Sequence, residues 1–131
     1  MIALDSSAIV AIALEEPEID DFKTLIVKFE ALVGTPTLLE SYLVLEQRIP
    51  GAANEFLSSF ITRPAVHPIA FNLTMYQLAQ DAFGAFGKGK GHPAKLNFGD
   101  CMSYAVAKFH DVPLLFKGGD FRLTDIRAAH P

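Results

Sequence analysis

The sequence predicts an α/β fold with a mainly parallel central sheet. Four short apolar segments are spaced along the chain, and stretches with helical spacing of apolar residues separate them. Strands that alternate with helices form βαβ units, whose parallel sheets are covered by helices on both faces. At 131 residues the chain has the length of one ordinary domain, and we expect a single domain over residues 1–131.

The first half of the chain supplies two of these strands. The apolar run Ile2–Leu4 predicts a short buried strand, and an apolar helical stretch follows it through Leu14. Pro17 suits a first helical position, and apolar residues then recur at helical spacing from residue 19 to residue 29. The elements expected next are a strand at 31–34, a helix that opens at 35–37 and stops before Pro50, and a helix marked by Ala52, Phe56, Leu57 and Phe60.

The second half supplies the other two strands. Residues 65–69 predict a strand that Pro68 confines to a sheet edge. Asn72 or Thr74 is expected to cap a helix that runs to about Phe83. The glycine- and lysine-rich stretch 84–99 predicts a long loop. A helix at 100–110, a strand at 113–116 and a turn at 117–120 complete the pattern.

Composition excludes several classes of protein. Cys101 is the single cysteine, which excludes an internal disulfide framework and a cysteine-based zinc cage and fits a reducing compartment. No targeting segment is visible, and the longest apolar run, near residues 8–14, is far shorter than the roughly 20 residues that span a bilayer. We therefore expect a cytoplasmic protein that makes no membrane contact.

The formal net charge of −4 is divided unevenly. Residues 1–60 carry ten acids and three bases, whereas residues 61–131 carry five acids and eight bases. The overall acidity argues against tight nonspecific binding to nucleic acid, because phosphate affinity comes mainly from Lys and Arg. The basic second half leaves room for a local patch that faces phosphate, so the charge neither requires nor excludes an RNA partner.

Four acidic residues stand at the ends of predicted elements. Asp5 directly follows the first strand, Glu40 lies in the first turn of the helix after the second strand, Asp100 begins the helix after the glycine-rich stretch, and Asp120 follows the fourth strand. In an open parallel sheet, ligands bind outside the carboxyl ends of the strands. We therefore expect these four side chains to meet at one end of the domain.

Each of these acids also has a purely structural interpretation. Asp5 and Asp100 are good helix N-caps, Asp120 is an ordinary turn residue, and the sequence from Thr37 to Glu40 matches a capping box. For each acid taken singly, this interpretation is at least as well supported as a functional one. The case for chemistry rests on the four together.

Crowded carboxylates either acquire raised pKa values or bind a cation. An oxygen-only set without Cys or His at ligand spacing points to Mg²⁺ or Mn²⁺ rather than zinc. Carboxylate-held divalent ions activate water and stabilise the leaving oxygen in phosphodiester cleavage. The four acids therefore suggest metal-dependent hydrolysis of a phosphodiester.

Other polar residues form weaker candidates for a site. The four histidines show no motif spacing, and Ser6 and Ser7 have no accompanying base, so a capping or metal-water contact suits these serines better than a nucleophilic role. The glycines of the 84–99 stretch do not match a phosphate-binding loop. Lys88, Lys90 and Lys95 could contact a nucleic-acid backbone, although a solvated basic loop is the ordinary interpretation.

Four segments of the chain form a distinctive series in order and spacing. The first is Met-Ile-Ala-Leu-Asp-Ser-Ser-Ala-Ile from residue 1, and the second is the Leu-Glu pair at 39–40 with Val-Leu-Glu-Gln-Arg at 44–48. The third runs from Lys-Leu-Asn-Phe-Gly-Asp at 95–100 through Ala107. The last is Leu-Leu-Phe-Lys-Gly-Gly-Asp-Phe at 114–121, followed by Thr-Asp-Ile at 124–126. Together these four segments resemble the PIN-domain family and its VapC-type toxins.

The resemblance implies a three-layer α/β/α fold and a Mg²⁺-dependent endoribonuclease (Mn²⁺ being possible), the toxin of a type II toxin–antitoxin pair. It further implies a homodimer neutralised by a small VapB-type antitoxin. By the family pattern, Asp5 and Asp100 are the main metal ligands and Glu40 and Asp120 complete the acidic pocket. Arg48 also matches a family position, where an internal salt bridge is as well supported as an RNA contact.

One departure from the pattern leaves an alternative open. The family's last motif commonly carries Asn or Asp before the final acid, where this chain has Gly119. A catalytically weak module that binds RNA or the antitoxin is therefore the second hypothesis. A receiver-type phosphoacceptor domain and an Asp-x-Asp phosphatase fit less well, because two serines follow Asp5.

Overall fold

The structure, a computed structural model, describes all residues 1–131. Four parallel strands form one sheet in the order β3-β2-β1-β4. They are β1 (Ile2–Leu4), β2 (Ala31–Gly34), β3 (Val66–Ile69) and β4 (Leu114–Leu115). The predicted parallel α/β fold is confirmed, and β3, which contains Pro68, lies at the edge as expected.

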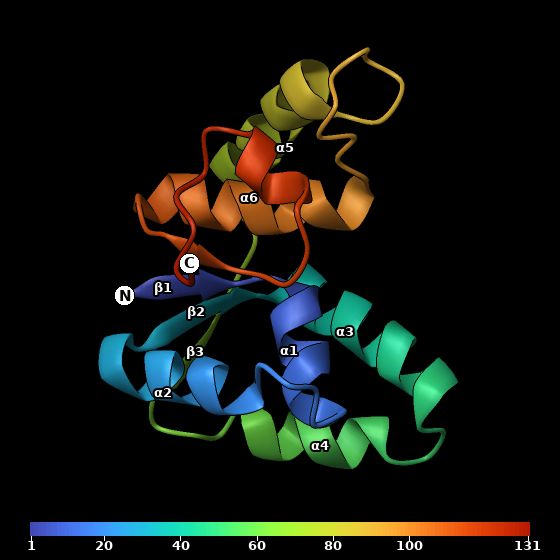
Figure 1. Ribbon diagram of the computed structural model, residues 1–131, viewed down its shortest axis with the longest axis vertical. Helices are drawn as coiled ribbons and strands as arrows, with labels where there is room; N and C mark the ends of the chain where they lie inside the picture. The colour runs from blue at the N-terminus through green and yellow to red at the C-terminus, as the bar shows by residue number, and fades with distance from the viewer.

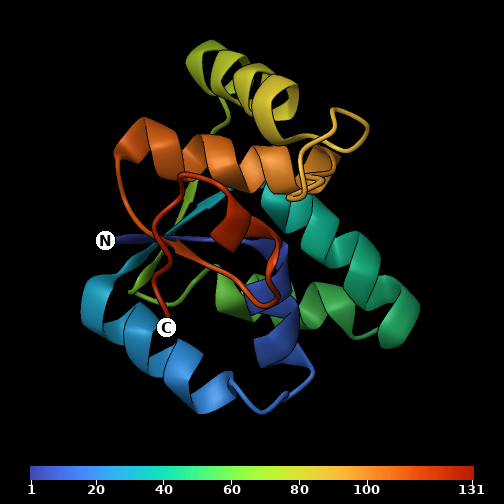
Figure 2. The same cartoon turned by 45° about the horizontal axis from the view of Figure 1, so that its top comes forward.

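Helices cover both faces of this sheet (Figures 1 and 2). Figure 1 shows one layer formed by α5 and α6 and the other by α1, α2 and α4, with α3 at the side of the sheet. The helices are α1 (Ser6–Ala13), α2 (Ile19–Phe29), α3 (Thr35–Arg48), α4 (Ala53–Phe60), α5 (Leu73–Phe86) and α6 (Phe98–His110), with a 3₁₀ helix, η1 (Asp120–Leu123).

Alternating strand residues supply the two halves of the core. Ile2 and Leu4 pack into the cluster beneath α1, α2 and α4, whereas Ala3 packs into the cluster beneath α5 and α6. This division follows from the period of two in a strand, which sends successive side chains to opposite faces. Strands β1, β2 and β4 are therefore buried along their whole length, as a sheet covered on both faces requires, whereas the edge strand β3 contains the partly exposed His67 and the exposed Pro68.

Three predicted boundaries are wrong. Helix α5 continues through Gly84 to Phe86, because Ala82 and Phe86 pack against the core beside α6 and outweigh the cost of one helical glycine. The loop is shortened accordingly, and the Lys88 amide closes it by donating to the Leu96 carbonyl. Helix α6 begins at Phe98 rather than Asp100, with Asn97 as its N-cap.

The remaining corrections concern helix starts. Helix α3 begins at Thr35 with Gly34 as its N-cap, so Thr37 lies inside the helix and forms no capping box with Glu40. Helix α2 begins at Ile19, two residues after Pro17. Asn72 caps α5 by accepting from the Met75 amide.

No helix is both long and apolar enough to cross a membrane.

Candidate active site

The four predicted acids lie on segments that meet at the carboxyl ends of the strands. Asp5 follows β1, Glu40 lies in the helix that begins directly after β2, and Asp120 starts η1 after β4. The fourth, Asp100, is the third residue of α6. The charges of Asp5, Glu40 and Asp120 all act on Asp100, so the structure brings the four carboxyl groups into one neighbourhood.

Asp5 is the most deeply buried of the four, with 3% of its surface exposed. Its side chain caps α1 by accepting from the Ser7 amide at 3.0 Å. The hydroxyls of Ser7 and Ser103 also donate to it, each at 2.6 Å. Three donors therefore fix the orientation of this carboxyl group, as burial of a polar group requires.

Glu40 extends from α3 to the first turn of α6. A Cβ built on Gly99 would overlap the Glu40 carboxyl group, so only glycine leaves it this space. Burial raises the pKa of Glu40, as does the charge of Asp5, while the Ser6 side chain lowers it in part. Glu40 Oε1 is buried and has no hydrogen-bond partner, which leaves one oxygen of the cluster available for a ligand.

Asp100 accepts from the Asn97 amide at 3.0 Å, and the Asp100 amide donates to Asn97 at 2.8 Å. The two residues therefore form a capping box in which Asn97 is the N-cap. Asp100 contributes from the first turn of α6 and is not itself the N-cap that the sequence predicts. Burial raises its pKa to about 6, with further increases from Asp5, Glu40 and Asp120 and a partial decrease from the Asn97 hydrogen bond.

The residues present suit a hard divalent cation. All four side chains offer carboxylate oxygens, the charges of Asp5, Glu40 and Asp120 act on Asp100, and one buried oxygen of Glu40 has no hydrogen-bond partner. The side chains do not converge as a preformed cage, since no three His, Cys, Asp or Glu residues are grouped closely enough to hold an ion. Asp120 is the only one of the four acids that is exposed.

The raised pKa of Asp100 predicts how stability depends on pH. Between pH 3.8, the ordinary pKa of an aspartate, and about pH 6, Asp100 loses its proton in the unfolded chain but keeps it in the folded protein. The free energy of unfolding therefore falls as pH rises through this window. For the metal-free protein we expect a loss of up to about 3 kcal/mol across this window. Urea unfolding of the wild type and of Asp100→Asn isolates the effect, because their difference in stability should change through pH 4–6 and level off above about pH 7. A difference independent of pH would contradict it.

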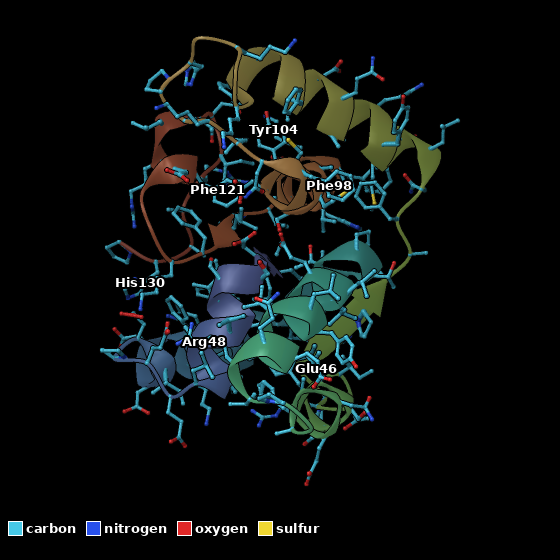
Figure 3. The ribbon with its side chains drawn as sticks, turned by 90° about the vertical axis from the view of Figure 1, so that its right-hand side faces the viewer. Glu46, Arg48, Phe98, Tyr104, Phe121 and His130 are labelled. Atoms are coloured by element: carbon cyan, nitrogen blue, oxygen red, sulfur yellow. The ribbon has the colours of Figure 1, made fainter.

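An apolar depression lies directly beside Glu40. It has a volume of about 570 Å³, and its lining includes Leu39, Leu43, Phe98 and Met102 together with Glu40 and Gly99. Phe98, at the start of α6, is 78% exposed, and in Figure 3 it lies beside α5. A second pocket of about 400 Å³ shares Phe98 and Met102, so the apolar surface continues from α3 across α6 to α5.

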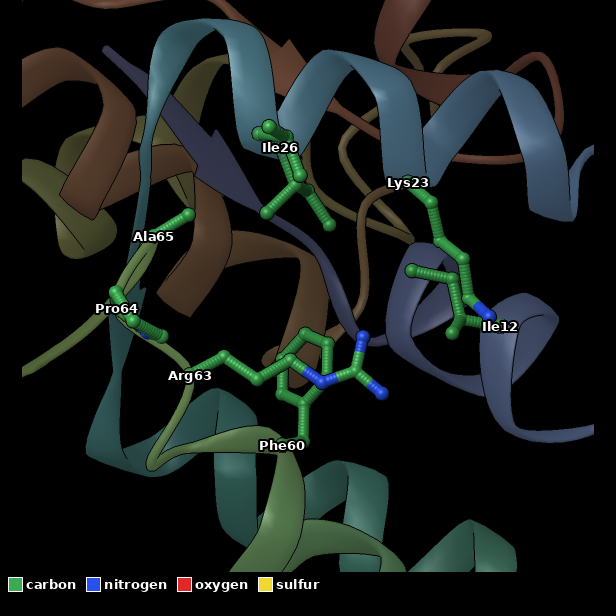
Figure 4. A pocket seen from close by; sticks show the side chains of 8 residues that line it. Ile12, Lys23, Ile26, Phe60, Arg63, Pro64 and Ala65 are labelled. Atoms are coloured by element: carbon green, nitrogen blue, oxygen red, sulfur yellow. The ribbon is translucent and has the colours of Figure 1, made fainter.

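A third cavity lies apart from the acids, next to the amino end of β3. It also has a volume of about 400 Å³ and is lined by Ile12, Ile26 and Phe60, among others, with Lys23 and Arg63 at its sides (Figure 4). No carboxylate lines it, and it contains none of the predicted site residues.

The predicted lysines do not contact the acids. Lys88, Lys90 and Lys95 are exposed on the loop before α6, and the Lys90 ammonium lies 5.7 Å from the centre of the Phe83 ring. None of the three pairs with a carboxylate, and neither does Arg48 at the end of α3. Their contact with substrate stays a prediction.

A comparison with protein families decides the classification. Residues 2–127 match the family described as the PIN domain. The chain belongs to the PIN-domain family. Its relatives place it among the VapC ribonucleases, and it is accordingly a nuclease of that family. It is 39% identical over 124 residues to a VapC ribonuclease of Mycobacterium bovis, covering 94% of each chain, and 38% identical over 128 residues to ribonuclease VapC of Mycolicibacterium smegmatis, covering 97% and 98%.

Solved structures confirm the PIN fold. Mycobacterium tuberculosis VapC20, described as a sarcin-ricin-loop-cleaving toxin, superposes with a TM-score of 0.79 over 100% of both chains at 17% identity. FitAcB of Neisseria gonorrhoeae gives a TM-score of 0.68 at 17% identity, covering 98% of this chain and 96% of that one. At these identities the likeness concerns the fold alone.

Sequence reasoning missed three residues of this PIN-domain site. Gly99 belongs to the stretch that the sequence predicts as a loop, although its missing side chain makes the space that Glu40 occupies. Ser103 binds Asp5, and Thr37 contacts Ser103 at 3.3 Å. The sequence does carry a sign of Ser103, because it is a small polar residue one turn after Asp100 on an otherwise apolar helix face.

Proposed function

We propose that the protein is a Mg²⁺-dependent endoribonuclease toxin, with Mn²⁺ as a substitute, that hydrolyses RNA phosphodiester bonds and is neutralised by a cognate VapB-type antitoxin. One PIN domain over residues 1–131 would perform the reaction in the cytoplasm. The observation that carries the proposal is the meeting of Asp5, Glu40, Asp100 and Asp120 at the carboxyl ends of the strands, where the charges of the other three act on Asp100.

In this proposal the four acids have different roles. Asp5, fixed by three donors, and Asp100 are the main ligands of the ion. When bound, the ion supplies an activated water and stabilisation of the leaving oxygen. Glu40, with its unpartnered Oε1, would orient and deprotonate the attacking water. The exposed Asp120 would position a second water or ion at the rim.

The surroundings of the acids suit a phosphodiester held between them and the basic loop. Lys88, Lys90 and Lys95 would contribute contacts to the RNA backbone, since their segment leads into the start of α6. The first turn of α6 also presents the positive end of a helix dipole to a phosphate. These features support binding of the nucleic acid beside the carboxyl cluster.

The exposed apolar surface supports the proposed partners. Leu39, Leu43 and Phe98 are each more than half exposed beside the acids, and apolar surface of this kind commonly marks a protein interface. A homodimer and an antitoxin are the partners that we propose for it. A toxin–antitoxin complex of Klebsiella pneumoniae shares the fold, with a TM-score of 0.65 at 12% identity over 92% of this chain and 90% of that one.

Cleavage of pooled cellular RNA tests the activity. We expect the purified protein to cut RNA with Mg²⁺ or Mn²⁺ and to lose all cleavage in EDTA, with recovery when excess Mn²⁺ is added. Cleavage that persists in EDTA would contradict a metal-dependent reaction.

RNA binding without cleavage in Mn²⁺ would instead favour the weak binding module that Gly119 suggested. Gly119→Asn then identifies the cause, because the backbone there has an ordinary φ of −106° and a Cβ would meet nothing within 4 Å. A gain of cleavage in that variant would attribute the weakness to the missing polar side chain.

A further inference from the structure

Buried polar side chains are concentrated at one place in this protein. Only Asp5, Thr37, Ser41 and Ser103 are buried among all the polar and charged residues. Three of them contact one another in series: Ser103 Oγ lies 2.6 Å from Asp5 Oδ1, and Thr37 Oγ1 lies 3.3 Å from Ser103 Oγ. Buried polar groups are costly unless they are paired, and each of these three side chains has a hydrogen-bond partner within the series.

The direction of each hydrogen bond in the series follows from proton counting. A serine hydroxyl has one proton to donate, and Ser103 donates it to the Asp5 carboxylate. Ser103 must therefore accept at its contact with Thr37, which makes the Thr37 hydroxyl the donor. The Thr37 hydroxyl thus orients the Ser103 hydroxyl so that its proton points at Asp5.

A second pair of hydrogen bonds involves the other carboxylate oxygen of Asp5. Ser7 Oγ donates to Asp5 Oδ2 at 2.6 Å and accepts from the Lys117 amide at 2.9 Å. Asp5 is thereby joined to the segment that follows β4 as well as to α3 and α6. The network therefore reaches every segment that carries one of the other three acids.

The spacing along each segment is the same. Thr37 lies three residues before Glu40 on α3, Ser103 lies three residues after Asp100 on α6, and Lys117 lies three residues before Asp120. On a helix, residues three apart are neighbours on one face. A shift of Thr37 or Ser103 would accordingly move Glu40 or Asp100 relative to Asp5.

We propose that Thr37 and Ser103 are positioning residues, which set the orientation of the Asp5 carboxylate and the spacing of α3 and α6 so that the four acids share one cation. This inference rests on the proposed metal-dependent function and adds two hydroxyl groups to the four acids. Partners that orient metal ligands from outside the coordination shell typically contribute about 10- to 100-fold in metal affinity or activity.

Thr37→Val and Thr37→Ser form a matched pair for the test. Valine keeps the branched shape without the hydroxyl, and serine keeps the donor. With Mn²⁺ as the probe in calorimetric titrations, we expect Thr37→Val to weaken binding about 10- to 100-fold and Thr37→Ser to stay within about threefold of the wild type. Ser103→Ala, which removes a donor from Asp5 directly, should weaken Mn²⁺ binding at least as much as Thr37→Val.

Ser41→Ala is the control for a purely structural effect. Ser41 is as buried as Thr37 and lies on the same helix, but its hydroxyl donates to the Thr37 backbone carbonyl and takes no part in the series to Asp5. We expect wild-type Mn²⁺ affinity and RNA cleavage in this variant, whatever its melting temperature.

The outcomes separate this inference from the function on which it rests. Mn²⁺ binding by the wild type that is equally tight in Thr37→Val and Ser103→Ala would overturn the positioning role and leave the metal site intact. Equal losses in Thr37→Val and Thr37→Ser would also overturn it, because the donor would then not matter. No Mn²⁺ binding by the wild type would remove the proposed function itself.

Discussion

Asp100→Asn is expected to abolish RNA cleavage and, in the absence of metal, to stabilise the protein at pH 7. Asparagine keeps a side-chain oxygen that can accept from the Asn97 amide, so the capping box survives. It removes a charge that Asp5, Glu40 and Asp120 all repel. Because burial and this repulsion raise the pKa of Asp100 from 3.8 to about 6, the gain in stability should be on the order of 1–3 kcal/mol.

The loss of cleavage should be larger than any effect of a residue outside the coordination shell, hence more than about 100-fold. Asp20→Asn is the matched control, since Asp20 also lies in the first turn of a helix but is exposed and far along the chain from the site. It should cut RNA normally and gain no stability. An Asp100→Asn protein that cleaves RNA at the wild-type rate would exclude Asp100 from the reaction.

A loss of stability in Asp100→Asn would instead indicate that Asp100 acts mainly as a capping residue. Loss of an N-terminal capping interaction costs about 0.5–2 kcal/mol, so a drop of this size would show that capping, and not repulsion among carboxylates, dominates at Asp100. The sign of the change in melting temperature therefore distinguishes the two interpretations that the sequence left open.

Gly99→Ala is expected to reduce cleavage about as severely, for a steric reason. The new Cβ would occupy the space of the Glu40 carboxyl group, which would have to leave the cluster. Alanine favours a helix over glycine by roughly 1 kcal/mol, which offsets part of the strain. We therefore expect a folded protein with cleavage lowered by at least about 100-fold, comparable to the loss of one interaction made in the reacting state.

Gly84→Ala provides the comparison for Gly99→Ala. Gly84 is also helical, but it is exposed on α5 and a Cβ there would meet nothing within 4 Å. The substitution should stabilise the protein by up to about 1 kcal/mol and leave RNA cleavage unchanged. If Gly99→Ala cleaves RNA as fast as Gly84→Ala does, the position of Glu40 is not important for the reaction.

The meeting of the four acids could be predicted because it depends on topology alone. Asp5, Glu40 and Asp120 each follow a strand closely, and parallel strands place their carboxyl ends at one edge of a sheet. Apolar periodicity was enough to recognise those strands. The fold class and the neighbourhood of the site were therefore accessible from local patterns.

The finer arrangement of the site could not be predicted from local patterns. The Thr37–Glu40 spacing fits a capping box, yet the N-cap of α3 is Gly34, three residues before Thr37, and Thr37 instead contacts Ser103, 66 positions away. Likewise, Gly99 looks like a loop glycine until α6 brings it against Glu40. Such contacts depend on how α3 and α6 pack, which the pattern of either segment alone does not contain.

Thermal melting with and without Mn²⁺ tests most directly whether a shared cation balances these carboxylates. A ligand that binds only the folded state stabilises it by about 2.7 kcal/mol at a concentration 100 times its Kd. We predict that Mn²⁺ raises the Tm of the wild type, whereas Asp100→Asn melts at nearly the same temperature with and without the ion. A wild-type Tm that Mn²⁺ leaves unchanged would contradict the account.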